Sequence, residues 1–159
     1  MWWLIGAVAC AVAVLIAVFV VINWQTIREM YREVQAERTR SLFGMQREHL
    51  EAHFLQQAAL SGKPRGLRWK DCEFDNYVCF ARDRMTGQFL ALVGVTIQFE
   101  PAEGADSEDW PSIEHRRSGT AVFHFEKGRW HTQGRALFNM SPDEALDHFR
   151  EQYERVELL

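Results

Sequence analysis

The stretch GTAVFHFEKGRWHTQGRALF, residues 119–138, carries the clearest fold signal in the chain. Glycine at the second position of Lys127-Gly128 suits a two-residue loop between antiparallel strands. This loop sets Phe125 opposite Trp130 and His124 opposite His131. Side chains alternate between the two faces of a strand, so the register divides the hairpin into a mainly apolar face and a mainly polar one. The apolar face contains Ala121, Phe123, Phe125, Trp130, Ala136 and Phe138, and the polar face contains Val122, His124, Glu126, Arg129, His131, Gln133 and Arg135. We therefore expect an antiparallel sheet with one face in water.

The segments before this hairpin extend the predicted sheet. FLALVGVTIQF, residues 89–99, has an apolar residue at every odd position, which indicates a core-facing strand. Its even positions are mixed, and we expect part of the second face to be covered near Leu90 and Leu92. RWKDCEFDNYVCFARD, residues 68–83, is predicted as two strands joined by a turn at Asp75-Asn76. A hairpin loop with a glycine follows at residues 83–88. The sheet then has about four to five strands.

One helix is predicted before the strands in the sequence, and another is predicted after them. Residues 25–60 contain no proline and one glycine, and SGKP at 61–64 supplies a helix stop. At the other end, MSPDEALDHFREQYERVELL, residues 140–159, is predicted as a helix. Ser141 is the expected N-cap, and Glu144 completes a capping box. The fold class is α+β, and the element order is similar to a cystatin-like layout, a resemblance that carries no function.

The first 24 residues, MWWLIGAVACAVAVLIAVFVVINW, contain no charged side chain. The distance from Trp3 to Trp24 along a helix is about 31 Å, which matches a bilayer core of about 30 Å. Trp2, Trp3 and Trp24 then fall at the two interfaces, where indole rings are enriched. A cleaved signal peptide is the alternative, but no basic residue precedes the run and no small-residue cleavage site ends it. We expect a retained transmembrane anchor.

Arginines set the expected orientation of this anchor. Arg28, Arg32, Arg38 and Arg40 follow the apolar run, and only the terminal amine precedes it. Positively charged flanks stay in the cytoplasm, so we expect the N-terminus outside and the C-terminal domain in the cytoplasm. The expected organisation is a transmembrane anchor at 1–24, a juxtamembrane stalk helix at 25–60 and a small α+β domain at 65–159.

Two histidine pairs are candidate metal sites. His49 and His53 stand four residues apart on a predicted helix, so both side chains project from one helix face. His124 and His131 form a cross-strand pair if the hairpin register holds. Imidazole nitrogens bind zinc and similar cations, but two ligands make a weak site. A solvated surface is the alternative for both pairs.

Residues 100–117 form a long acidic connection that contains Trp110-Pro111. A connection of this length is usually functional or disordered. Trp110 and Pro111 are candidate partner-binding residues, because buried tryptophans carry much of the energy of interfaces. The alternative is that Trp110 packs on its own domain.

Other functional classes lack signals in the sequence. The net charge of −4 argues against nucleic acid as a partner. Three cysteines are too few for a disulfide framework. No phosphate-binding loop, dinucleotide fingerprint or nucleophile elbow is present, so we expect no enzyme activity and no cofactor. The predicted function is a membrane-anchored accessory or scaffold subunit whose α+β domain docks on, or stabilises, a larger membrane protein complex. The expected partners are the lipid bilayer and other membrane protein subunits. The alternatives are a membrane-tethered ligand- or metal-binding domain, possibly enzymatic, and a membrane-tethered homo-oligomer.

Overall fold

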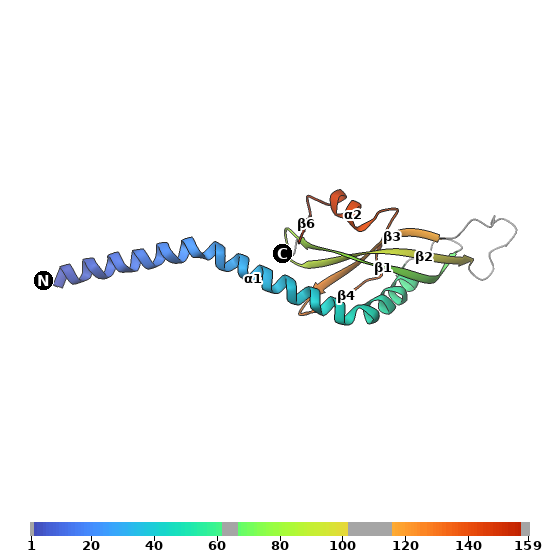
Figure 1. Cartoon of the computed structure of the whole chain (residues 1–159), viewed down its shortest axis with the longest axis horizontal. Coiled ribbons are helices and arrows are strands. Elements are labelled where there is room, and N and C mark those ends of the chain that lie inside the picture. Colours follow the sequence, from blue (N-terminus) through green and yellow to red (C-terminus); the bar gives the residue numbers. More distant parts are fainter. Residues whose placement is uncertain (1, 62–66, 102–115, 157–159) are drawn as a thin grey trace. The chain divides into compact units, whose positions relative to one another are not determined.

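The computed structural model describes residues 2–61, 67–101 and 116–156 and shows an α+β fold (Figure 1). The elements run in the order α1 (Trp2–Ser61), β1 (Leu67–Asp83), β2 (Phe89–Pro101), β3 (Arg116–Glu126), β4 (Arg129–His131), β5 (Ala136–Phe138), α2 (Pro142–His148) and β6 (Tyr153–Arg155). The predicted α+β class and antiparallel sheet are confirmed. The end of the first helix at SGKP is also as predicted.

Six strands of the described chain form one antiparallel sheet, one more than the four to five expected. The strand order is β4-β3-β2-β1-β6, and β5 pairs with β3 beside β4. The predicted hairpin register is confirmed, because His124 pairs with His131 and Phe125 with Trp130. Lys127 and Gly128 both have positive φ angles, 53° and 79°, as a tight hairpin loop requires.

The second half of α1 packs on one face of the sheet through aromatic side chains. Phe43 of α1 contacts Phe123 and Trp130, with ring centroids 5.4 and 5.1 Å apart. About three helical turns later, Phe54 contacts Phe123 as well and is fully buried. The indole Nε1 of Trp130 donates a 2.8 Å hydrogen bond to the carbonyl oxygen of Thr39 in α1. This face is the large core of the domain.

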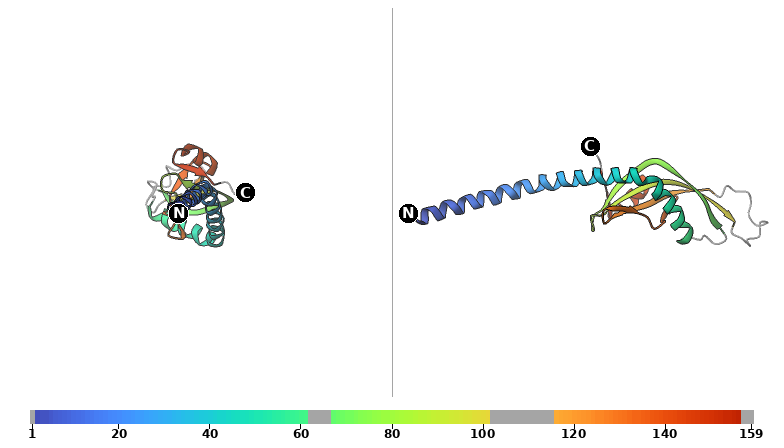
Figure 2. Two further views of the ribbon diagram at one scale, coloured as in Figure 1. Left: turned by 90° about the vertical axis from the view of Figure 1, so that its left-hand side faces the viewer. Right: turned by 90° about the horizontal axis from the view of Figure 1, so that it is seen from below.

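The opposite face carries a smaller, mainly aliphatic core under α2. Figures 1 and 2 show α2 and the second half of α1 on opposite sides of the sheet. The predicted capping box at Ser141 and Glu144 is present and starts α2. The buried members of this second core are Cys79, Ala81, Leu90, Leu92, Val122, Ala145 and Leu146. The predicted cover over Leu90 and Leu92 is therefore α2.

Residues 1–38 and 39–159 form two compact units, and α1 contributes to both. The expected transmembrane helix is not supported by the structure. Over the residues that it describes, no helix is both long enough and apolar enough to cross a membrane.

The predicted turn at Asp75-Asn76 is wrong, because β1 is one strand of 17 residues. The two residues lie where the pairing of β1 with β2 shifts register, between Phe74 and Val78. Arg47 of α1 donates hydrogen bonds to the carbonyl oxygens of both Asp75 and Asn76. The polar pair therefore forms an irregularity within a strand, and a side chain from α1 stabilises it.

The predicted C-terminal helix is too long. Helix α2 ends at His148, and after a turn the chain forms β6, which pairs with Ala81–Asp83 of β1. Tyr153 packs against the second core from this strand. Pairing with the free edge of β1 takes the place of further helical turns.

Candidate functional site

All three predicted interface residues, Trp2, Trp3 and Trp24, are exposed on α1. Trp2 is 89% exposed and Trp3 is 79% exposed, while Trp24 is half exposed. Between them, large apolar side chains are at least 47% exposed: Val12, Val14, Leu15, Ile16, Val18, Phe19, Val20, Val21 and Ile22. Residues 18–22 are consecutive and cover more than one helical turn, so apolar side chains point in every direction around the axis. We call residues 12–24 the apolar segment.

The His49–His53 pair lies on α1 with its rings nearly parallel and their centroids 6.5 Å apart. The Nε2 atom of His53 is 3.4 Å from the side-chain nitrogen of Gln57. An amide nitrogen is not a metal ligand, so Gln57 in this orientation cannot complete a site. The predicted helix-face pair exists, but the structure brings no third ligand to it from the described residues.

The His124–His131 pair spans β3 and β4, with ring centroids 5.8 Å apart. The Nε2 atom of His131 is 3.9 Å from a carboxylate oxygen of Glu126. Burial, and then the charges of His131 and Arg135, hold the pKa of His124 below its usual value. Within the described part of the chain, no three His, Cys, Asp or Glu side chains are close enough together to hold a metal ion.

The two cysteines of the sheet are separate thiols whose pKa values are raised. Cys72 lies opposite Ile97 and Cys79 opposite Leu92, which places the two on opposite faces. Both are free. Burial raises the pKa of Cys72 to about 12, with a smaller contribution from Asp71, and burial also raises the pKa of Cys79. Thiols with raised pKa values are poor nucleophiles.

Trp110 and Pro111, the predicted partner-binding residues, lie outside the described residues. The connection in which they stand therefore remains a sequence-based prediction.

A polar cluster that the sequence did not indicate joins three elements at the edge of the sheet. Arg155 of β6 bonds to Asp143 of α2 at 2.5 Å and to the hydroxyl of Tyr77 in β1 at 3.3 Å. The Tyr77 hydroxyl also donates to Asp143, at 3.2 Å. The hydrogen bond from Arg155 is the main reason that the pKa of Asp143 lies below its usual value. Tyr77 and Asp143 are 66 positions apart in the chain, and Asp143 and Arg155 are 12 apart. No local sequence pattern predicts that the three side chains meet.

A second polar surface surrounds a close approach of β1 to β2. A Cβ atom at Gly94 would overlap the carboxylate of Asp75, so the side chain of Asp75 occupies the space that a larger residue would need. Asp75, Gly94, Thr96, Ser118 and Glu144 contribute to an open groove of about 370 Å³. Glu144 already accepts hydrogen bonds from Ser141 in the capping box. The carboxylate of Glu144 thus has a structural role.

Comparison of the chain with protein families, with curated proteins and with solved structures finds no match.

Proposed function

We propose that this chain is a single-pass, membrane-anchored accessory subunit whose α+β domain docks on a larger membrane protein complex. The observation that carries the anchor is the exposure of the apolar segment around the whole helix. Full removal of one Val, Leu, Ile or Phe side chain from water is worth about 1.5–3 kcal/mol. A helix that is apolar on all sides is stable only inside a core or a bilayer.

The proposal treats residues 1–24 as one segment, because no charged side chain interrupts them. Tryptophans near both ends match the two interfaces of a bilayer. The arginines that follow, Arg28, Arg32, Arg38 and Arg40, favour a cytoplasmic domain under the positive-inside rule.

The docking part of the proposal depends on the acidic segment between β2 and β3, residues 102–115, which is shorter than the predicted connection at 100–117. Its sequence places one large aromatic residue, Trp110, beside Pro111 and among acidic residues. Such an aromatic side chain is a typical anchor of a protein interface. Other membrane protein subunits are the proposed partners.

Membrane attachment is tested by washing isolated membranes with alkaline carbonate. The full chain should stay in the pellet. Replacing both Leu15 and Phe19 with Arg should release it, because each central arginine costs about 2.5–3.5 kcal/mol on the insertion scale. The control is Val34→Arg, which adds a charge to an exposed position of the same helix beyond the apolar segment. Release of the unmodified chain, or retention of the double variant, would contradict the anchor.

Orientation is tested with Met85→Cys. Met85 lies in the loop between β1 and β2 and is 92% exposed, whereas Cys79 is buried. A bulky maleimide should label the new cysteine only after the cells are permeabilised. Labelling of intact cells would place the domain outside.

Docking is tested by purifying the chain from its native membrane in mild detergent and sizing the particle. We expect a complex with other proteins that Trp110→Ala disrupts and Met85→Ala leaves intact. A monomer without a partner would contradict the proposal. A particle that contains only this chain, shown by cross-linking, would support a homo-oligomer instead.

A second candidate function is a membrane-tethered metal-binding domain, which the 5.8 Å separation of the His124 and His131 rings favours. Two imidazoles on neighbouring strands can share one cation if other ligands complete its shell. Metal analysis of the purified chain separates the candidates. Stoichiometric zinc that His131→Ala removes would support this function, and metal-free protein would exclude it.

A further inference from the structure

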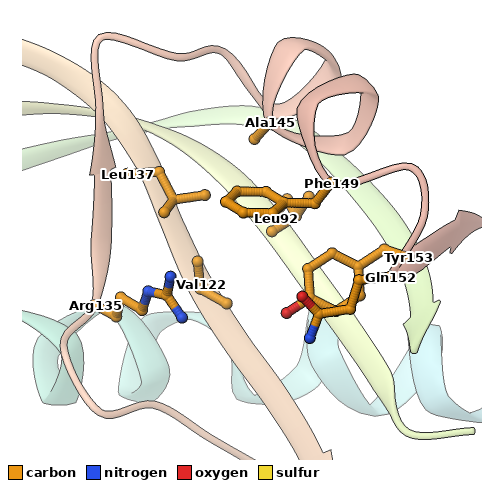
Figure 3. A pocket seen from close by; sticks show the side chains of 8 residues that line it. All are labelled: Leu92, Val122, Arg135, Leu137, Ala145, Phe149, Gln152 and Tyr153. Carbon is orange, nitrogen blue, oxygen red and sulfur yellow. The ribbon is translucent and has the colours of Figure 1, made fainter. Parts of the chain in front are cut away.

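A small cavity lies between α2, the chain around β5 and the second core (Figure 3). Its volume is about 70 Å³. Leu92 and Val122 form the floor, on β2 and β3, and Leu137 and Phe149 form walls. Each of these four side chains presents carbon atoms to the cavity. The interior therefore favours a hydrocarbon group.

Three polar side chains stand at the opening of this cavity. Figure 3 shows the guanidinium of Arg135 on one side and the polar ends of Gln152 and Tyr153 on the other. The backbone of Arg135 is fixed, because its carbonyl oxygen accepts a 3.1 Å hydrogen bond from the Val122 amide. The opening thus joins an apolar interior to a set of hydrogen-bond donors.

Arg135 is not neutralised by its described surroundings. The described residues provide no carboxylate within ion-pair distance of its guanidinium, whereas Arg47, Arg68, Arg84 and Arg155 each have one. Its charge also acts on nearby groups. Burial raises the pKa of Tyr153, and the charge of Arg135 opposes that rise. A guanidinium beside an apolar cavity is suited to a carboxylate, which it can bind through two parallel hydrogen bonds.

We infer that this cavity binds a small aliphatic carboxylate, with the carboxylate at Arg135 and the hydrocarbon chain between Leu137 and Phe149. The volume limits the ligand. A water molecule occupies about 30 Å³ in the liquid, and an engineered cavity of about 150 Å³ accepts benzene. A cavity of about 70 Å³ is therefore suited to an acid of roughly two to four carbon atoms. The side-chain nitrogen of Gln152 already donates to Asp83, at 3.5 Å, so the phenol of Tyr153 is the second donor that the lining offers.

Equilibrium dialysis of the full chain in a neutral, non-ionic detergent tests this inference with radiolabelled propionate as the probe. We expect one saturable site per chain. Propanamide has nearly the same shape and no charge, so it should compete at least tenfold more weakly. The reason is that a hydrogen bond to a charged group is worth about 1.5–3 kcal/mol. Inorganic phosphate tests for a general anion site, and it too should compete poorly because it has no hydrocarbon chain.

Two substitutions separate the role of Arg135 from a general effect of charge. Arg135→Gln should weaken propionate binding at least tenfold, and Arg135→Lys should restore part of the affinity. Arg129→Gln is the matched control, because Arg129 is exposed on the same hairpin, lies opposite Glu126 and does not line the cavity. It should leave binding unchanged. Thermal unfolding of each variant checks that the fold is intact.

Three outcomes would overturn the inference. They are no saturable binding of propionate at millimolar concentration, equal competition by propanamide, and equal losses in Arg135→Gln and Arg129→Gln. All three are independent of the membrane anchor and of any protein partner, because the cavity belongs to one compact unit, residues 39–159.

Discussion

The two faces of the sheet are built from different side chains. The face toward α1 is filled by large aromatic rings, which form a connected set from Phe43 through Phe123 to Phe54. The face toward α2 is covered by a seven-residue helix over small and aliphatic side chains. Large rings fill much of the first face, whereas the second has a small cavity with polar groups at its margin. We therefore expect the first face to contribute more to stability than the second.

Truncation of the aromatic face should have the largest effect. Phe54 is fully buried and contacts Trp69, Phe74 and Phe123. Phe54→Ala should lower the free energy of unfolding by about 3–5 kcal/mol, through lost burial and the cavity that remains. Met45→Ala, at a 73% exposed position of the same helix, should change it by less than about 0.5 kcal/mol. Urea unfolding in mild detergent measures both, and similar losses would show that α1 does not form the main core.

Truncation of the face under α2 should cost less. Leu146→Ala removes a buried side chain from the second core, and we expect a loss of about 2 kcal/mol, at the low end for leucine in a core. A helix of only seven residues can shift to fill part of the space. Asp147→Ala, at the next and exposed position, is the control. A loss as large as that of Phe54→Ala would remove the proposed difference between the faces.

The polar cluster of Tyr77, Asp143 and Arg155, which we call the edge cluster, should have the smallest effect on stability. This effect should depend on pH. Because Arg155 lowers the pKa of Asp143 below 3.8, the ionised carboxylate stabilises the fold above that pH. This stability is lost as the pH falls through the lowered pKa that Asp143 has in the folded chain. Asp143→Asn should therefore destabilise by less than about 1 kcal/mol near pH 6, since the pair is exposed. The difference from the unmodified chain should shrink toward pH 2.

Glu151→Gln provides the control for this titration, because Glu151 is exposed and lies outside the edge cluster. Unfolding curves at pH 6, 4 and 2 measure the effect. A difference between Asp143→Asn and the unmodified chain that stays constant over this range would show that the ion pair is not its cause.

Local signals in the sequence predicted the local parts of the structure. The loop at Lys127-Gly128 fixed the pairing of His124 with His131, because a two-residue loop leaves one register. The capping box at Ser141 and Glu144 was found for the same reason, since all of its hydrogen bonds join neighbouring residues. Alternation in residues 89–99 predicted which side chains of β2 face the large core.

Contacts between distant residues could not be predicted from local patterns. Asp75-Asn76 has the composition of a turn, but Arg47 and the space above Gly94 accommodate it within β1. The helix predicted after His148 stops because residues 153–155 pair with β1, some 70 positions earlier. The cavity at Arg135 was missed because its walls come from β2, β3, β5 and α2.

The pairing of β6 with β1 has a consequence for synthesis of the chain. The last strand of the described sheet completes the edge of its first strand, so this edge stays incomplete until residue 155 has left the ribosome. Chains are made from the N-terminus, and unpaired strand edges promote aggregation. If residues 1–24 are held in the membrane by then, the unfinished domain waits beside the bilayer. Tethering would keep incomplete chains apart during that interval.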